Sequence, residues 1–437
     1  MAATKNLIVA YEHDRLLKCD EACNNCVSEY IDGSCCINYC KPTHFKELYD
    51  YCVNKNIDCG FDYIPKEKCI KFDKYTGVIQ LKDGTYLEIL PKIDKNTNLE
   101  DSRKVFENLV FASHNLTKEY KHNKSSDNDT RKDNHIIEIF ISVFCKDILE
   151  LLKRGIKKSY IRKSENLNNY KGKLNFSEHI KHNITSKNKF FVEYSEFSLD
   201  IPENRILKSA CLYLIKQTEI EENKKILRRF LIELDDVSTS INLDKDLQEK
   251  QINRLHEYYS RPLQYAEFFL RRDNFIPRRG RTSLPALLFP LNKMFEDYIE
   301  NLFKQSNIDY CVQYSRYNLI FTGEKELFNT QMDFIIVSED KSRELILDAK
   351  WKELDVNDEK LGVSQTDLYQ LYNYASIIRS KESKNVSIAL LYPQTSKFNQ
   401  VKEWSYFDGT KIYIIPVNVL DIDRNQQLSD VINSLNI

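Results

Sequence analysis

Two apolar runs in the last third of the chain constrain its fold more than any other feature. They are QMDFIIV (331–337) and ELILDAKWK (344–352), and the polar segment 338–343 separates them. Short β-branched and aliphatic runs joined by a polar turn predict two paired strands. We therefore expect Asp333 and Asp348 to lie near one end of a hairpin.

The residues at this end have the chemistry of a hydrolytic metal site. Successive strand side chains alternate between faces, so Asp348 and Lys350 project to the same side. Two carboxylates can hold one or two Mg²⁺ ions, which lower the pKa of a bound water, and a lysine can orient that water or offset charge in phosphodiester hydrolysis. A second interpretation stays open on these residues alone: two aspartates that end strands and a solvated edge lysine.

The two flanking segments favour the metal site. Upstream, LNKMFEDYIENLF (291–303) predicts an amphipathic helix with Glu296 and Glu300 near the core. Downstream, DLYQLYNYASII (367–378) places Gln370 and Tyr374 one helical turn apart on one face. The order is thus an acid-bearing helix, two strands with acids, and a Q-x-x-x-Y helix.

This order resembles the PD-(D/E)xK nuclease superfamily. From about residue 70 onward the chain also resembles the McrC family, the nuclease subunits of modification-dependent McrBC restriction systems. The elements that carry the second resemblance occur in the family's order: YTGVIQL and LEILPKI within 75–93, YKGKLNFSEHIKHN (170–183), IPENRILKSACLYL (201–214), MFEDYIENLF, ILDAKWK and DLYQLYNYA.

The resemblance implies a DNA endonuclease that depends on Mg²⁺ and works with McrB, an AAA+ GTPase that recognises modified DNA, such as DNA with 5-methylcytosine, and assembles into rings. The N-terminal half would dock on this ring and stimulate GTP hydrolysis, and the C-terminal domain would cut double-stranded DNA once translocation stalls. The sequence has neither a G-x-x-x-x-G-K-[ST] nor a G-x-G-x-x-G pattern, so we expect a partner to hydrolyse the nucleotide.

By the same resemblance, Asp333 and Asp348 become metal ligands and Lys350 the catalytic lysine. Gln370 and Glu296 become supporting groups, with Glu300 as a rival to Glu296. The chain departs from the family pattern before the first aspartate, where Met332 stands in place of a proline.

Composition and punctuation predict three regions. These are a cysteine-rich segment (1–70), a middle region (71–275), and an α/β domain (282–437) after the proline- and arginine-rich segment 274–290. The resemblance implies that the middle region serves activation and partner docking and that the last region is a PD-(D/E)xK nuclease domain. The expected fold class is an α+β N-terminal region, with a β-hairpin and helices, followed by an α/β domain like that of restriction endonucleases.

Within the middle region, apolar and polar residues alternate on both sides of Asp83-Gly84, and this pattern predicts a β-hairpin over 75–93. The polar segment 117–134 is expected to be a mobile loop. It has too little apolar surface for burial to offset the conformational entropy that it would lose on ordering. Apolar residues at helical spacing predict one long helix from Ile136 to Gly155 and another that begins at Pro202.

Two residue groups outside the site suggest further contacts. Nine of the 12 cysteines lie in the first 69 residues. The four at Cys23, Cys26, Cys36 and Cys40 have spacing that can close a structural Zn²⁺ site, or they are reduced, partly buried thiols. The arginines that precede the nuclease region are DNA-binding candidates or, equally, a solvated helix end: Arg271, Arg272, Arg278, Arg279 and Arg281.

The net charge does not distinguish between possible functions, because the chain has nearly equal numbers of basic (64) and acidic (65) side chains. No apolar run reaches the roughly 20 residues of a membrane-spanning helix, and the first residues lack the pattern of a signal peptide, so we expect a cytoplasmic protein without a membrane partner. Two other functions stay open: a self-sufficient restriction or repair nuclease, and a scaffold that activates a GTPase without cutting.

Overall fold

The structure is a computed structural model of the 437-residue chain. It describes residues 7–18, 37–54, 61–65, 69–72, 74–94, 97–114, 135–185, 188–273, 286–306, 308–314, 318–321, 325–329, 332–338, 340–382, 384–421 and 426–434. The predicted loop 117–134, three of the four zinc candidates (Cys23, Cys26 and Cys36) and the arginines Arg278, Arg279 and Arg281 lie outside these residues.

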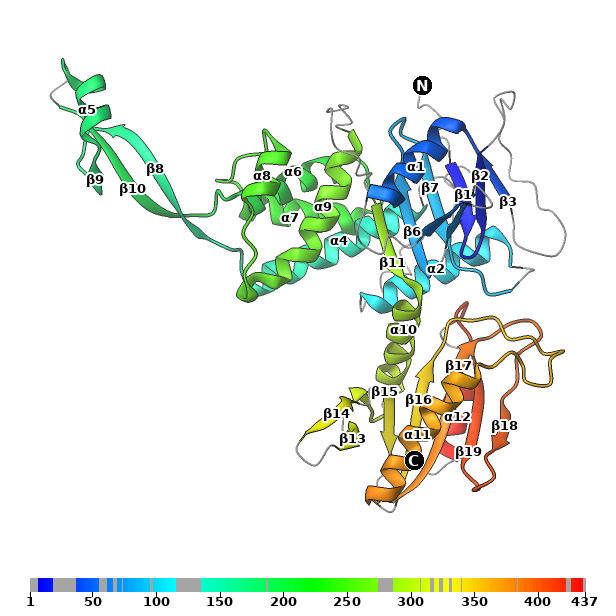
Figure 1. The fold of residues 1–437 in the computed structure, drawn as a ribbon. Coiled ribbons are helices and arrows are strands. Elements are labelled where there is room, and N and C mark those ends of the chain that lie inside the picture. Colours follow the sequence, from blue (N-terminus) through cyan, green and yellow to red (C-terminus); the bar gives the residue numbers. More distant parts are fainter. Residues whose placement is uncertain are drawn as a thin grey trace. The chain divides into compact units, whose positions relative to one another are not determined.

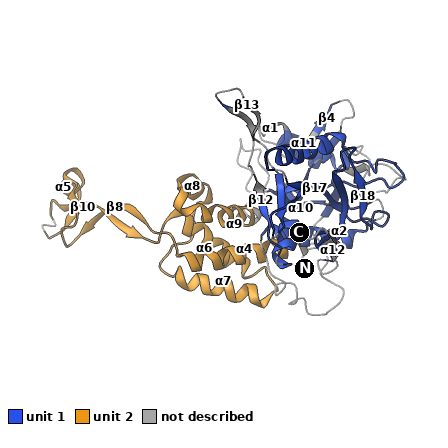
Figure 2. Cartoon of the chain, turned by 90° about the horizontal axis from the view of Figure 1, so that it is seen from below, with its two compact units in different colours: residues 1–117, 280–437 blue, residues 118–279 orange. Residues whose placement is uncertain are grey.

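The chain forms two compact units (Figure 2). Unit 1 consists of residues 1–117 and 280–437, and unit 2 consists of residues 118–279. The chain thus leaves unit 1 once and returns to it. This arrangement depends on a strand pairing between segments more than 200 residues apart, which local periodicity does not encode.

The N-terminal part of unit 1 is built on a sheet with strand order β1-β7-β6-β11. β6 and β7 form the predicted hairpin, in which Gly84 has φ 86° at the turn, so that prediction is confirmed. β11 pairs antiparallel with β6, and a Cβ on Gly77 would lie 2.0 Å from the carbonyl oxygen of Leu287, so only glycine permits this approach. The strands are β1 (Leu7–Tyr11), β6 (Tyr75–Gln80), β7 (Tyr86–Leu90) and β11 (Ala286–Pro290).

A second, smaller sheet and two helices complete this part of unit 1. Its strand order is β3-β2-β5-β4. The elements are β2 (Arg15–Lys18), β3 (Ile37–Cys40), α1 (Pro42–Asn54), β4 (Phe61–Ile64), β5 (Cys69–Phe72) and α2 (Leu99–Ser113). Cys40, the remaining zinc candidate, ends β3.

The C-terminal part of unit 1 is a mixed six-stranded sheet with order β12-β15-β16-β17-β19-β18, flanked by helices (Figure 1). β16, β17 and β19 are parallel, whereas β15 pairs antiparallel with β16. The elements are α10 (Leu291–Gln305), β12 (Cys311–Tyr314), β13 (Asn318–Phe321), β14 (Glu326–Asn329), β15 (Met332–Val337), β16 (Arg343–Ala349), α11 (Gln365–Glu382), β17 (Asn385–Pro393), β18 (Lys402–Ser405), β19 (Lys411–Val417) and α12 (Gln426–Ser434). A mixed α/β domain is therefore confirmed.

The two parts of unit 1 are joined by polar contacts as well as by the chain. β11 runs directly into α10, and the side-chain amide of Asn108 on α2 donates to the carbonyl of Val419, after β19, at 2.7 Å. The buried carboxylate of Glu12, just after β1, accepts hydrogen bonds from the Lys92 amide at 3.0 Å and from the Trp351 indole Nε1 at 2.5 Å. The N-terminal sheet is thereby bonded to the residue that follows Lys350.

Unit 2 is a helical body with a long protruding arm (Figure 1). The predicted helices at Ile136–Gly155 and from Pro202 are confirmed as α4 and α6, and Gly155 ends the first with φ 96°. The helices are α4 (His135–Arg154), α6 (Pro202–Leu214), α7 (Glu221–Glu233), α8 (Leu243–Glu249), the 3₁₀ helix Arg254–Tyr259 and α9 (Ser260–Asp273). The arm consists of β8 (Ser159–Leu167), β9 (Lys173–Leu174), α5 (Phe176–Asn183) and β10 (Phe190–Ser198).

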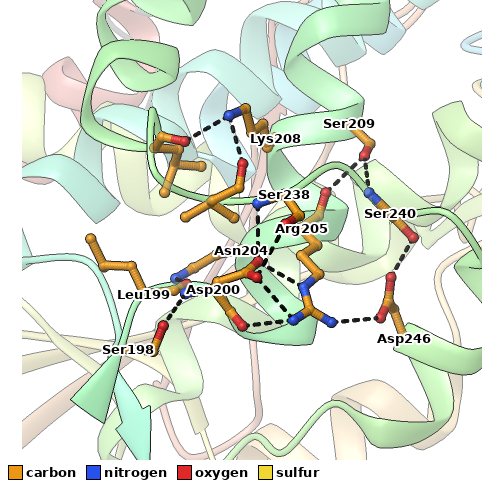
Figure 3. Close-up of polar contacts among 12 residues, drawn as sticks. Ser198, Leu199, Asp200, Asn204, Arg205, Lys208, Ser209, Ser238, Ser240 and Asp246 are labelled. Atoms are coloured by element: carbon orange, nitrogen blue, oxygen red, sulfur yellow. Dashed lines mark hydrogen bonds and ion pairs between the residues drawn. The ribbon is translucent and has the colours of Figure 1, made fainter. Parts of the chain in front are cut away.

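A polar network fixes the base of the arm to the helices (Figure 3). Just after β10, Asp200 accepts two hydrogen bonds from the Arg205 guanidinium on α6, at 2.7 and 3.1 Å. Arg205 also pairs with Asp246 on α8 at 3.8 Å. Lys208, one turn further along α6, donates to carbonyls that follow α7, including those of Leu234 and Val237. The segment 200–208 thus joins the arm to three helices.

None of the helices in the described residues is long and apolar enough to cross a membrane.

Candidate active site

The two predicted metal ligands lie side by side on adjacent strands. Phe334 on β15 is paired with Leu347 on β16, and one further step of this antiparallel register places Asp333 beside Asp348. One Asp333 oxygen, Oδ2, accepts a hydrogen bond from the Ala349 amide at 3.0 Å. The pairing of the strands therefore positions both carboxylates at the end of β16, as the two apolar runs predicted.

Lys350 joins this pair as expected. Its Nζ lies 2.7 Å from Oδ2 of Asp348. Burial raises the pKa of Asp348 to about 7, the nearby Asp333 raises it too, and Lys350 opposes both effects. Burial acts to lower the pKa of Lys350, but Asp348 and the neighbouring acids outweigh this effect and leave the pKa above its ordinary value. The lysine is therefore a cation at neutral pH.

The structure separates Glu296 from its rival, Glu300. Burial raises the pKa of Glu296, and the next cause is the charge on Asp333, so Glu296 lies within electrostatic reach of the site. Its carboxylate is 3.0 Å from Lys293 Nζ. Glu300 instead pairs with Lys304 at 2.7 Å and accepts a 3.3 Å hydrogen bond from the Tyr310 hydroxyl. Of the two acids, Glu296 is therefore the one on which the charge of Asp333 acts.

The Q-x-x-x-Y helix is α11. Gln370 donates to the Tyr374 hydroxyl at 3.0 Å, and Tyr374 is buried whereas Gln370 is exposed. The sequence thus identified the correct helix from the Q-x-x-x-Y pattern, but it did not identify Asp367 in the first turn of α11. Asp367 acts electrostatically on both Asp348 and Lys350. The signal that could have identified it is its spacing of four and seven residues from the buried Leu371 and Tyr374.

This arrangement fits a hard divalent cation. Asp333 and Asp348 supply oxygen ligands, and their negative charges repel each other in a partly buried place. A cation would relieve this repulsion, which together with burial raises the pKa of Asp348. In the described part of the chain, no three Asp, Glu, His or Cys side chains are close enough to coordinate one ion together. An ion held here would therefore take its carboxylate ligands from Asp333 and Asp348, and water would fill the positions that the protein leaves open.

The other candidate groups do not join this site in the described residues. Arg271 on α9 pairs with Glu267 at 2.8 Å and with Asp244 at 3.2 Å, so its guanidinium is engaged within unit 2. The backbone of Arg272 continues the same helix. The zinc site and the DNA contacts of these arginines stay predictions.

Comparison with known proteins shows the family. Residues 70–393 match the model of the McrBC 5-methylcytosine restriction system component, which is more than half of the chain, and the protein belongs to this family. A curated relative is the type IV methyl-directed restriction enzyme EcoKMcrBC of Escherichia coli (strain K12), which is 22% identical over 301 residues, 65% of this chain and 84% of the relative.

A solved structure has the same fold. It is the refined half-complex from a tetradecameric assembly of Thermococcus gammatolerans McrB AAA+ hexamers with bound McrC. The matching chain has a TM-score of 0.54 and 18% sequence identity, and the match covers 98% of this chain and 100% of that one. The resemblance to the McrC family is thus confirmed, and it extends over unit 1 and unit 2.

Proposed function

We propose that this protein is the DNA endonuclease subunit of an McrBC-type restriction system and hydrolyses phosphodiester bonds with Mg²⁺ in a domain of the PD-(D/E)xK class. The observation that carries the proposal is the group of Asp333, Asp348 and Lys350 at one end of a mixed sheet. Family membership supports it, because the matching family is a component of 5-methylcytosine restriction systems.

Each side chain has a role that follows from its surroundings. Asp333 and Asp348 would hold Mg²⁺, which supplies a bound water of lowered pKa and neutralises charge on the phosphate. Lys350, whose ammonium lies 2.7 Å from Asp348, would stabilise the negative charge that develops on phosphate oxygens. Glu296 adds negative charge next to Asp333, and Gln370, which is held by its hydrogen bond to Tyr374 on α11, is the supporting group that the family resemblance implies.

The partner is an AAA+ GTPase of the McrB kind, and the substrate is DNA with modified cytosine. Support comes from the structural relative, in which McrC is bound to McrB AAA+ hexamers, and from the absence of a nucleotide-binding glycine loop in this sequence. In this role the chain stimulates the GTP hydrolysis of its partner and cuts DNA only in the assembly. Both proteins act in the cytoplasm.

The arm of unit 2 is the surface we assign to this partner. A soluble surface seldom exposes a group of large apolar side chains unless it binds something. Along the arm, six such side chains are 57–72% exposed: Tyr160, Tyr170, Phe176, Ile180, Ile184 and Phe197. The arm extends away from the helices (Figure 2), so it can enter a concave partner without displacing the helical body.

Cleavage of a cytosine-methylated plasmid tests the proposal. The wild-type chain, Asp348→Asn and the matched control Glu359→Gln, an exposed acid outside the site, are each combined with the GTPase, Mg²⁺ and GTP. We expect cutting by the wild type and by the control only, with GTPase stimulation intact in all three. Cutting without the GTPase would favour a self-sufficient nuclease, and stimulation without any cutting would favour a scaffold.

A further inference from the structure

Asp367 lies on the face of α11 that packs on the sheet. It precedes Leu371 by four residues and Tyr374 by seven, and these two side chains are 1% and 8% exposed within the core between α11 and the strands. Residues at this spacing share one face of a helix. Asp367 itself is half-buried in the first turn. Its carboxylate accepts no hydrogen bond or ion pair from the side chains of the described residues.

Tyr392 is the second unusual group and comes from β17. Asp348 is paired with Leu390 in the parallel register, so Tyr392, two residues further on, lies on the same face of the sheet and next to Lys350. The Lys350 amide donates to the carbonyl of Leu391 at 2.9 Å, which fixes this register at the strand ends. Tyr392 is 1% exposed, yet its hydroxyl has no hydrogen-bond partner in the described residues.

A buried hydroxyl without a partner is unfavourable by roughly 1–3 kcal/mol. Such groups in native proteins usually bind a water or an ion that the protein chain does not itself supply. The unpartnered hydroxyl is therefore evidence for a ligand at this point, independent of the acids around it.

Asp367 and Tyr392 lie on the same site as Asp348. Burial raises the pKa of Tyr392, and the next causes are the charges on Asp367 and Asp348. In the described part of the chain no three Asp, Glu, His or Cys side chains are close enough to hold one ion together, so Asp333, Asp348 and Asp367 do not form a three-carboxylate site. Contact through water remains, and Mg²⁺ characteristically keeps several waters when few protein ligands hold it.

We propose that Asp367 and Tyr392 bind one water of the Mg²⁺ hydration shell, whose two hydrogens point to the Asp367 carboxylate and to the Tyr392 hydroxyl oxygen. Both are positioning residues, since they act through the water on the ion. The proposal rests on the proposed function, and it adds a second tier of groups contributed by α11 and β17 to the two ligands on β15 and β16.

The test measures Mn²⁺ binding to the full chain by electron paramagnetic resonance, which separates bound from free ion without DNA or GTPase. Groups that orient metal ligands typically change metal affinity about 10- to 100-fold. We expect Asp367→Asn to weaken Mn²⁺ binding about 10-fold or more and Tyr392→Phe about 3- to 10-fold. In the cleavage assay, a raised Mg²⁺ concentration should restore much of the rate of both variants, which a merely structural role would not give.

Asp348→Asn and Glu359→Gln separate the two proposals. If Asp348→Asn abolishes Mn²⁺ binding while Asp367→Asn and Tyr392→Phe bind like the wild type and Glu359→Gln, the water contact is wrong and the nuclease site stands. If the wild type binds no Mn²⁺, or Asp348→Asn binds it equally well, both proposals fall. Tyr392→Phe removes a single oxygen, so it decides the question if Asp367→Asn does not fold.

Discussion

The buried ion pair beneath the arm offers a sharp test of how unit 2 is held together. Lys157 and Glu203 side chains are 8% and 3% exposed, and Lys157 Nζ lies 2.8 Å from Glu203 Oε1. The same oxygen accepts a 2.6 Å hydrogen bond from the Gln251 amide. Glu203→Gln keeps the shape of the side chain but removes its charge, so it leaves the Lys157 ammonium buried without a counter-ion.

The expected cost follows from these two bonds. A hydrogen bond to a charged group contributes about 1.5–3 kcal/mol, and removal of one partner from a buried ion pair typically costs about 3–5 kcal/mol. Each 1.4 kcal/mol corresponds to a factor of about ten. Amides that exchange only when unit 2 opens should therefore exchange about 10²- to 10³-fold faster in the variant. The effect should include α6, whose first turn carries Glu203, and the start of α9, which follows Tyr259, the residue whose hydroxyl accepts a hydrogen bond from the Lys157 amide.

Native-state hydrogen exchange by mass spectrometry measures this change in the full chain and reads unit 2 separately from unit 1. The matched control is Glu222→Gln on α7, which makes the same chemical change in an exposed pair with Lys225, with side chains 47% and 69% exposed. A pair of this kind is worth about 0.5 kcal/mol or less. If Glu203→Gln accelerates exchange no more than Glu222→Gln, the pair does not stabilise unit 2 and the reasoning is refuted.

Two further outcomes concern the arm and its base. Phe176→Ser combined with Ile180→Ser should weaken binding to the GTPase ring by about 30-fold or more in sedimentation experiments, as loss of an apolar hot spot does. The control is Ile241→Ser, since Ile241 is 98% exposed outside the arm and its loss should leave the affinity unchanged. Equal affinities of the two variants would contradict the docking surface. For Asp200, burial acts to raise the pKa, but hydrogen bonds from Arg205 and Ser238 leave it below its usual value of 3.8. The ionised Asp200 therefore stabilises the fold above pH 3.8, and this stabilisation is lost as the pH falls through the lowered pKa. Asp200→Asn should therefore cost about 1 kcal/mol at pH 7 in denaturant unfolding and progressively less below pH 3.8; a cost that does not depend on pH would contradict the role of the charge.

The sequence predicted those parts of the molecule that depend on local patterns. Alternation around Asp83-Gly84 identified the hairpin of β6 and β7, and apolar spacing with Gly155 identified α4 and its end. The pairing of Asp333 with Asp348 was predictable as well, because a hairpin brings residues from both strands to one end. In each case the residues that decide the structure are close in the chain.

Contacts between distant segments were beyond this reasoning. β11 joins the N-terminal sheet through Gly77, more than 200 residues earlier, and no pattern in its five residues indicates that partner. Asp367 and Tyr392 belong to the site only because α11 packs on β17, a contact that places the first turn of the helix at the strand ends. Glu296 and Glu300 are four residues apart on one helix, and only the packed structure shows that the charge of Asp333 acts on Glu296.

The hydrogen bond between Glu12 and Trp351 gives a partner a mechanical route to the site. Trp351 follows Lys350 directly, and its ring is in T-shaped contact with the ring of Phe295, the neighbour of Glu296 in α10. A displacement of β1 relative to β16 must therefore either break a hydrogen bond to a buried carboxylate or move the strand end that carries Lys350. A load on the N-terminal sheet would therefore reach the end of β16 through this hydrogen bond, next to the site at which we propose that DNA is cut.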